Sequence, residues 1–382
     1  MTVRRLDSRD CSIDEFVALI DAGVEATSIA RFEFADRIDH GAVVYDTPAL
    51  RRVLHDEHVV RALLGELAEV LLDGPGIVVF EGAVDPVVVD AANTEFFAII
   101  DDQRAAGTSA GDHFAKAGAN DRIWSALQKL AERSPDVFCD YYANDVLALV
   151  SEAWLGPGYQ ITSQVNVVNP GGEAQQPHRD YHLGFMTVDE AERFPAHVHR
   201  LSPLMTLQGA IAHCDMPVES GPTMYLPHSQ KYELGYVAWW LDDFKDYFAE
   251  HHVQVPLRTG DAVFFNPALF HGAGKNRTAD VRRIANLLQI GTAMGRTLEH
   301  VDRRTMVERL YPVWLERVDA GADRAAIDRS VAAAAEGYYA PLDLDVHQPT
   351  DGLHPPADID HIRSALDARS SWADLADRLP VR

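Results

Sequence analysis

The sequence predicts a mainly β core, a sandwich or barrel, packed by flanking helices within one chain of 382 residues. Between residues 160 and 291, several short β-branched or apolar runs are separated by turn residues, which is typical of all-β sandwiches and barrels. Before and after this region, apolar residues recur at helical spacing instead. With 47% hydrophobic and 24% charged residues, the chain has the composition of a globular protein with a full core.

The first part of the chain predicts helices around one short strand. A helix is expected over residues 47–73, with Thr47 as its N-cap and apolar residues along one face. Residues 77–80 are apolar and bounded by glycines, so they predict a short buried strand. A second helix is expected to begin near Asp85, and residues 121–153 also have helical periodicity.

The predicted strands lie in "QITSQVNVVNPGG", "PLMTLQGAIAHCDM", "SGPTMYLPHS" and "VRRIANLLQIG", with a hairpin around the turn at residues 258–261. Helical spacing returns over residues 304–318, and "HIRSALDA" near the end predicts a short helix. We therefore expect one domain over residues 1–382. Its parts are a helical N-terminal extension (1–75), a β core with helical insertions (76–292) and a helical C-terminal extension (293–382).

Composition limits the partners and the location. The net charge of −24 argues against nucleic acid, which requires a basic face, and against anionic membranes. We found no apolar run of membrane-spanning length and no signal-peptide pattern at the start, so we expect a cytoplasmic protein. The three cysteines are too far apart to suggest a disulfide scaffold or a cysteine metal site. The apolar face of the helix over residues 304–318 offers a surface for a homodimer.

One stretch, "QQPHRDYHLGF", carries the main chemical signal, because His178, Asp180 and His182 stand at alternate positions. On a β-strand these three side chains would share a face. Two imidazoles and one carboxylate on one face of an octahedron form the facial triad of non-haem Fe(II) oxygenases. His271 follows an apolar strand and is the best candidate for the distant third ligand. A further imidazole would close an open position, so His182 is expected beside the ligands or in the pocket wall.

Arg282 follows His271 by eleven residues, in the last predicted strand. A guanidinium in a barrel wall is costly unless an anion meets it. A dicarboxylate cosubstrate would provide that anion, with one end on iron and the other paired with arginine.

Together, "HRD", "ESGPTMYLPHSQKY" and "HGAGKNRTADVRR" resemble the phytanoyl-CoA dioxygenase family of Fe(II)/2-oxoglutarate oxygenases, over roughly residues 70–292. The resemblance implies a double-stranded β-helix (jelly roll) that binds Fe(II) through His178, Asp180 and His271. It implies 2-oxoglutarate paired with Arg282, whose offset fits the family; Arg283 is the alternative, because the strand register is unknown. Two polar side chains of the preceding strand are candidates to help hold the cosubstrate, namely Gln164 and Asn166. Ala273 departs from the family, which often has a small hydroxyl residue there.

The expected reaction uses Fe(II), 2-oxoglutarate and O2, with ascorbate as a candidate reductant, to hydroxylate or desaturate an unactivated carbon with release of succinate and CO2. Relatives that halogenate lack the carboxylate, and this chain keeps Asp180. A cupin-like isomerase or hydrolase that does not use 2-oxoglutarate is the alternative, and a non-enzymatic binding module ranks last. The charge of −24 favours a neutral or cationic small molecule, such as a specialised metabolite or an amino-acid derivative. Residues 111–124 and 236–248 are candidate lids, although the aromatic residues of the second favour a core role.

Three further side chains are expected to lie away from the proposed site, in the core or at the surface. His213 lies in a predicted core strand and is expected to be a buried histidine with its hydrogen bonds satisfied. His228, in a predicted turn, is expected to face solvent. Arg179 lies between two proposed ligands and is expected on the opposite face, in solvent or in a salt bridge.

Overall fold

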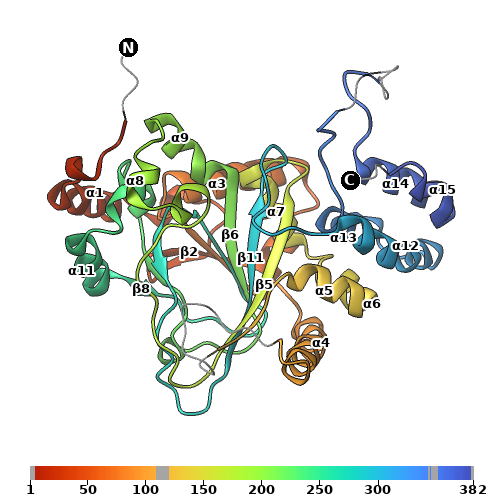
Figure 1. Cartoon of the computed structure of the whole chain (residues 1–382), viewed down its shortest axis with the longest axis horizontal. Helices are drawn as coiled ribbons and strands as arrows, with labels where there is room; N and C mark the ends of the chain where they lie inside the picture. Colours follow the sequence, from red (N-terminus) through yellow and green to blue (C-terminus); the bar gives the residue numbers. More distant parts are fainter. Residues whose placement is uncertain (1–4, 109–119, 343–344, 346–351, 380–382) are drawn as a thin grey trace.

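The computed structural model describes residues 5–108, 120–342, 345 and 352–379 (Figure 1). Its strands form two sheets, one in the order β1-β2-β3-β9-β6-β11-β5-β4 and one in the order β10-β7-β8. The strands of the larger sheet are β1 (Arg37–Asp39), β2 (Ala42–Asp46), β3 (Ile77–Glu81), β4 (Asn120–Ile123), β5 (Gln160–Val168), β6 (Thr206–Ala212), β9 (Ala262–Phe265) and β11 (Arg283–Gly291). Those of the smaller sheet are β7 (Met224–Leu226), β8 (Val253–Gln254) and β10 (Phe270–Gly272).

The two sheets are the two layers of a double-stranded β-helix, so the predicted jelly-roll core is confirmed. Val263 and Phe265 of β9 belong to the same buried cluster as Tyr225 of β7. Neighbouring strands are antiparallel except β2 and β3, which makes the large sheet mixed. Among the described residues this sheet ends at β1 and β4 and does not close into a barrel. The space between the sheets is where a site can form.

Helices cover the outer face of the large sheet. Contacts join α3 (Glu57–Leu72) to β3, α7 (Asp145–Leu155) to β6, and both α5 (Ala126–Arg133) and α13 (Arg324–Ala334) to β5. Strand β6 is buried along its whole length and β5 at all but one residue. In β5, the apolar residues Ile161, Val165 and Val167 pack in the core. They alternate with polar residues such as Gln164 and Asn166, which point to the opposite face of the sheet.

A second group of helices lies against the small sheet, on the opposite side of the molecule from α12 (Arg303–Asp319) and α13 (Figure 1). It includes α1 (Ile13–Ala26), α8 (Val188–Ala191), α10 (Gly235–Ala238) and α11 (Asp242–His251). Their apolar side chains share one buried cluster with Leu226 of β7 and Phe270 of β10. The short α9 (Ala196–Leu201) lies nearby.

The N-terminal part differs from the prediction in two ways. The predicted helix over residues 47–73 is two helices, α2 (Thr47–Arg51) and α3, because the Asp46 and Asp56 side chains each accept a backbone N–H and begin a new helix. Asp46, not Thr47, is therefore the N-cap. The segment before residue 75 also contributes β1 and β2, which were not predicted. The strand at residues 77–80 is confirmed as β3, and α4 (Pro86–Ala105) begins after its predicted cap, Asp85.

The stretch over residues 121–153 is mostly helical, as predicted, but it is divided. It begins with β4, continues as α5 and α6 (Pro135–Tyr141), and ends with α7. Pro135 stands in the first turn of α6, where its missing N–H costs nothing, and the Asn144 side chain caps α7. These local signals break one periodic run into three helices.

The predicted hairpin around residues 258–261 is wrong. Strand β8 pairs with β7 in the small sheet, whereas β9 pairs with β3 and β6 in the large sheet. The turn therefore carries the chain from one layer to the other. Both flanking runs are apolar, so their sequence does not distinguish a hairpin from a crossover between sheets.

At the C-terminal end, the predicted helix over residues 304–318 is confirmed as α12 (Arg303–Asp319). The tail ends in α14 (Asp358–Ala368) and α15 (Trp372–Ala376). In the part of the chain that the structure describes, no helix is long and apolar enough to cross a membrane.

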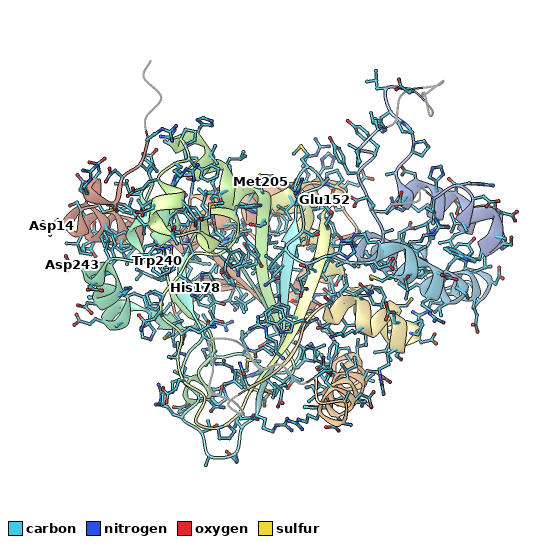
Figure 2. All side chains as sticks on the ribbon, viewed as in Figure 1. Asp14, Glu152, His178, Met205, Trp240 and Asp243 are labelled. Carbon is cyan, nitrogen blue, oxygen red and sulfur yellow. The ribbon has the colours of Figure 1, made fainter. Side chains whose placement is uncertain are left out.

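The structure describes only part of the first candidate lid, whereas it describes all of the second. Residues 111–119 of the first lie outside the described residues, and its last residues include β4. In the second, Tyr236, Phe244 and Phe248 are almost completely buried, which confirms the core reading of this aromatic run. Trp240 is 42% exposed, beside α11 (Figure 2).

Candidate metal centre

Three side chains converge from two segments of the chain. His178, Asp180 and His271 each present a ligand atom, and these atoms lie within 4.8 Å of one another. The Asp180 carboxylate lies between the imidazoles: Oδ1 is 3.7 Å from Nε2 of His178, and Oδ2 is 3.4 Å from Nε2 of His271. The structure thus brings together the three residues expected from the sequence, in a set that fits a ferrous ion with open positions.

A short backbone bridge joins the two segments. The His178 N–H donates to the His271 carbonyl at 2.9 Å, and the His271 N–H returns a bond at 3.1 Å. In Figure 2, His178 lies well inside the outline of the molecule, between α11 and β6 in this view. Because this bridge places the two histidines directly opposite each other, it sets the distance between their side chains.

The strand expected through His178, Asp180 and His182 is not formed: only His178 pairs, in an isolated bridge. Tyr181 and His182 have φ values of 62° and 45°, and His182 begins a short 3₁₀-helix. Because these left-handed residues end the alternation, His182 does not share a face with the ligands in the way the sequence suggested. It is absent from the described lining of the cavity, so the pocket-wall expectation is corrected.

Hydrogen bonds orient both imidazoles. Nδ1 of His178 lies 3.0 Å from the Gln176 carbonyl, and Nδ1 of His271 lies 2.9 Å from the Leu269 carbonyl. A carbonyl can only accept, so each Nδ1 carries the proton and the lone pair of Nε2 points toward Asp180. This tautomer is the one that metal-binding histidines need.

The Asp180 carboxylate is held by a neighbour that the sequence reasoning missed. Nε2 of Gln208, on β6, donates to Oδ2 of Asp180 at 2.5 Å. Burial raises the pKa of Asp180, but His178 and His271, together with the Gln208 bond, hold this pKa well below its usual range. The group is therefore an anion at neutral pH. Gln208 lies in a plain apolar strand, and only the pairing of β6 with β9 and β11 places it here.

The three residues lie at a cavity of about 480 Å³ between the two sheets. The large sheet contributes alternate residues of β11, namely Arg283, Ala285, Leu287 and Gln289. Tyr225 of β7 and His271 of β10 line the cavity from the small sheet. Phe185 and Leu298 also line it and are 59% and 41% exposed, so they mark its opening to solvent.

The structure separates the two candidate arginines. Arg283 is 7% exposed and lines the cavity, where its Nη1 donates only to the carbonyls of Ser220 and Gly274, at 3.3 and 3.4 Å. Among the described residues no carboxylate pairs with it, and burial lowers its pKa to about 10. Arg282 instead lies outside the cavity, 3.7 Å from Asp121 and over the ring of Phe97. The expected place of Arg282 in the cavity wall is therefore corrected: the alternative, Arg283, lies there, because β11 begins at Arg283 and its odd-numbered residues face inward.

Gln164 and Asn166 both line the cavity from β5. Their partners in β11 are Leu287 and Ala285, so all four share the inner face. The Gln164 side-chain carbonyl accepts from Arg122 of β4, and its amide donates to Gln289 at 3.2 Å. Arg122, Trp124 and Glu299 also line this part of the cavity. Arg122 and Trp124 belong to the candidate lid over residues 111–124, but their place beside Gln164 depends on the pairing of β4 with β5, and Glu299 was not predicted.

The predictions for His213, His228 and Arg179 can be compared with the structure. His213 is a buried core histidine, as predicted, with Nε2 2.8 Å from the Tyr141 hydroxyl and Nδ1 2.8 Å from Oδ1 of Asn93. His228 was expected in solvent but is 2% exposed, in contact with Thr27 and Lys231. Arg179 was also expected outside and is likewise 2% exposed.

Comparisons with curated proteins give partial matches to fungal dioxygenases. The chain is 29% identical over 154 residues to Dioxygenase trt7 of Aspergillus terreus, which covers 40% of this chain and 48% of that protein. It is 31% identical over 117 residues to Dioxygenase cdmD of Talaromyces verruculosus, covering 30% of this chain and 34% of that protein. The matches thus span less than half of the length of these relatives.

Two solved structures illustrate the structural likeness. The α-ketoglutarate-dependent epimerase SnoN from nogalamycin biosynthesis has a TM-score of 0.40 and 22% identity, covering 61% of this chain and 84% of that one. HygX from Streptomyces hygroscopicus, with nickel, 2-oxoglutarate and hygromycin B bound, has a TM-score of 0.43 and 15% identity, covering 62% and 90%.

A sequence model of the family described as phytanoyl-CoA dioxygenase matches residues 72–284. This range agrees with the resemblance over roughly residues 70–292 and includes all three converging side chains. Because the match spans more than half of the 382 residues, the protein belongs to the phytanoyl-CoA dioxygenase family.

Proposed function

We propose that the protein is an Fe(II)- and 2-oxoglutarate-dependent dioxygenase that hydroxylates, or desaturates, an unactivated carbon of a small molecule, with release of succinate and CO2. Iron, 2-oxoglutarate and O2 are the cofactors of its family. The observation that carries the proposal is the convergence of His178, Asp180 and His271 on a cavity that also holds a buried arginine without a carboxylate partner among the described residues.

The residues present fit the metal. His178 and His271 would bind it through Nε2, and Asp180 through its carboxylate, which is already anionic. Three protein ligands leave the other positions of an octahedral ion open for the cosubstrate and O2. When bound, iron and 2-oxoglutarate supply the oxidation of the substrate carbon. The chain positions the reactants and keeps water out.

Arg283 is our proposed partner for the distal carboxylate of 2-oxoglutarate, in place of Arg282. Its guanidinium is buried in the cavity and lacks an anion among the described residues, which makes a bidentate carboxylate the natural partner. Tyr225 lines the same cavity and is buried, and its hydroxyl can donate to the same carboxylate.

The polar part of the cavity around Gln164, Gln289 and Glu299 is our proposed place for the substrate. Asn166 lies one inward-facing position along β5, where it can contact either the cosubstrate or the substrate. The net charge of −24 supports a neutral or cationic small molecule, such as a specialised metabolite or an amino-acid derivative.

The test is succinate formation from 2-oxoglutarate by the Fe(II)-loaded protein in air, with and without His178→Ala. We expect the rate of succinate formation to fall at least about a hundredfold in the variant, because the two remaining ligands hold iron poorly. His251→Ala, at an exposed imidazole on α11, is the matched control and should retain full activity. If the wild type consumes no 2-oxoglutarate, or if His178→Ala releases succinate at the wild-type rate, the proposal is wrong. Turnover of a substrate without O2 would favour the cupin-like isomerase or hydrolase instead.

A further inference from the structure

The segment that carries two of the three ligands is held by few backbone contacts. Besides the bridge to His271, the Asp180 N–H donates to the Pro267 carbonyl at 3.2 Å and the Gln175 N–H to the Ala273 carbonyl at 2.8 Å. The next two residues, Tyr181 and His182, both have positive φ, which costs of order 1 kcal/mol for each residue with a side chain. This backbone alone is therefore a weak support for ligands that must hold one geometry.

Arg179 lies between the two ligands and supplies further contacts. Its side chain is buried, and Nη2 donates to the carbonyls of Ser229 at 2.6 Å and Tyr232 at 3.1 Å. Its Cζ lies 5.0 Å from the centroid of Tyr236 and 5.3 Å from that of Phe270, within reach of cation–π attraction. No carboxylate among the described residues pairs with it. The guanidinium is therefore held by carbonyls and ring faces alone.

These contacts reach the third ligand as well. Phe270 directly precedes His271 on β10, so the guanidinium stacks on the residue next to the distal histidine. Gly235 leaves the room for the guanidinium, because a Cβ at that position would lie 1.9 Å from Cζ of Arg179. The Arg179 side chain thus contacts α10 and β10, and its two neighbours in the chain are the ligands His178 and Asp180.

We propose that Arg179 is a positioning residue of the metal centre, which ties the His178–Asp180 segment to the strand of His271 through Phe270 and the carbonyls of Ser229 and Tyr232. This inference rests on the proposed metal site. A buried guanidinium without a carboxylate is expensive, and an apolar side chain would fill the same space at lower cost. We infer that this cost is offset by preorganisation of the ligands, because a metal binds more tightly when its ligands are already in place.

The experiment measures metal affinity directly, by anaerobic titration calorimetry of the full chain with Fe(II) alone. Arg179→Met removes the charge and the two hydrogen bonds while keeping most of the length, and we expect a tenfold to hundredfold weaker affinity, roughly the effect of losing an outer partner of a ligand. Arg179→Lys keeps the charge without the planar fork, so it should recover part of the loss. Arg200→Met is the matched control, because Arg200 is exposed and pairs with Glu233 at the surface. It should bind Fe(II) like the wild type.

Thermal unfolding of the metal-free proteins separates positioning from simple stabilisation. If Arg179→Met or Arg179→Lys lowers the Tm but binds Fe(II) as tightly as the wild type, the inference is overturned. Should Arg179→Met fail to fold, Arg179→Lys decides the question by the same comparison. A wild type that does not bind Fe(II) would overturn the proposed function itself, so the two failures are distinguishable.

Discussion

At the scale of single residues, two adjacent arginines show how one position decides a role. Arg283 begins β11 and pairs with Val168, which places it in line with Ala285 and Leu287 on the inner face. Arg282 stands one residue before the strand and contacts Asp121 on the outside. Because side chains alternate along a strand, a shift of one residue exchanges the inside for the outside.

Arg283→Met should raise the KM for 2-oxoglutarate by about a hundredfold, because a charge-assisted pair with a buried carboxylate contributes about 2–3 kcal/mol. Arg282→Met, one residue away, should leave this KM within about twofold. Steady-state succinate formation at varied 2-oxoglutarate measures both values. Equal effects of the two substitutions, or a larger effect of Arg282→Met, would contradict the assignment.

His213 should make the protein sensitive to acid. Burial lowers its pKa to about 3, whereas an exposed histidine has a pKa of about 6.5. Between these values the unfolded chain binds a proton that the folded chain does not, so the free energy of unfolding falls as the pH falls. The loss is at most about 1.4 kcal/mol per pH unit. Urea unfolding between pH 7 and pH 5 should show a shallower pH slope in His213→Asn than in the wild type.

At the scale of elements, helix α1 supports a strand far away in the sequence. Phe16 is completely buried, and its ring centroid lies 5.2 Å from that of Phe270 and 5.1 Å from that of Phe244. Helix α1 precedes the family match at residues 72–284, yet it packs beside the strand that carries His271. The N-terminal extension is thus part of the support of the metal centre.

Phe16→Ala should destabilise the fold by about 3–5 kcal/mol, the usual cost of deleting a buried aromatic ring. Val24→Ala removes a side chain from the same helix at a site that is 59% exposed, and it should change the free energy of unfolding by less than about 0.5 kcal/mol. Chemical denaturation of the two variants compares them directly. A similar small effect of both would show that α1 is not packed as described.

At the scale of the whole molecule, the net charge of −24 opposes the approach of 2-oxoglutarate, which is a dianion at neutral pH. Salt shortens the reach of this repulsion, from about 30 Å at 10 mM to about 10 Å at 100 mM. The kcat/KM for 2-oxoglutarate should therefore rise a few-fold over this range, with little change in kcat. A fall in kcat/KM with added NaCl would indicate that local positive charge, such as that of Arg122 and Arg283, dominates the approach.

The sequence by itself determined the β core, the helices around it and the family. It also predicted that the side chains of His178, Asp180 and His271 come together. These follow from local signals: alternation, helical spacing, turn residues and a short motif. Only the tertiary structure decided that Arg283 faces the cavity, that Gln208 holds Asp180 and that Arg179 is buried. These features depend on strand register, on two left-handed residues after Asp180 and on layers that meet far apart in the chain. A local pattern specifies which side chains can share a face, but the pairing of distant strands decides which face turns inward.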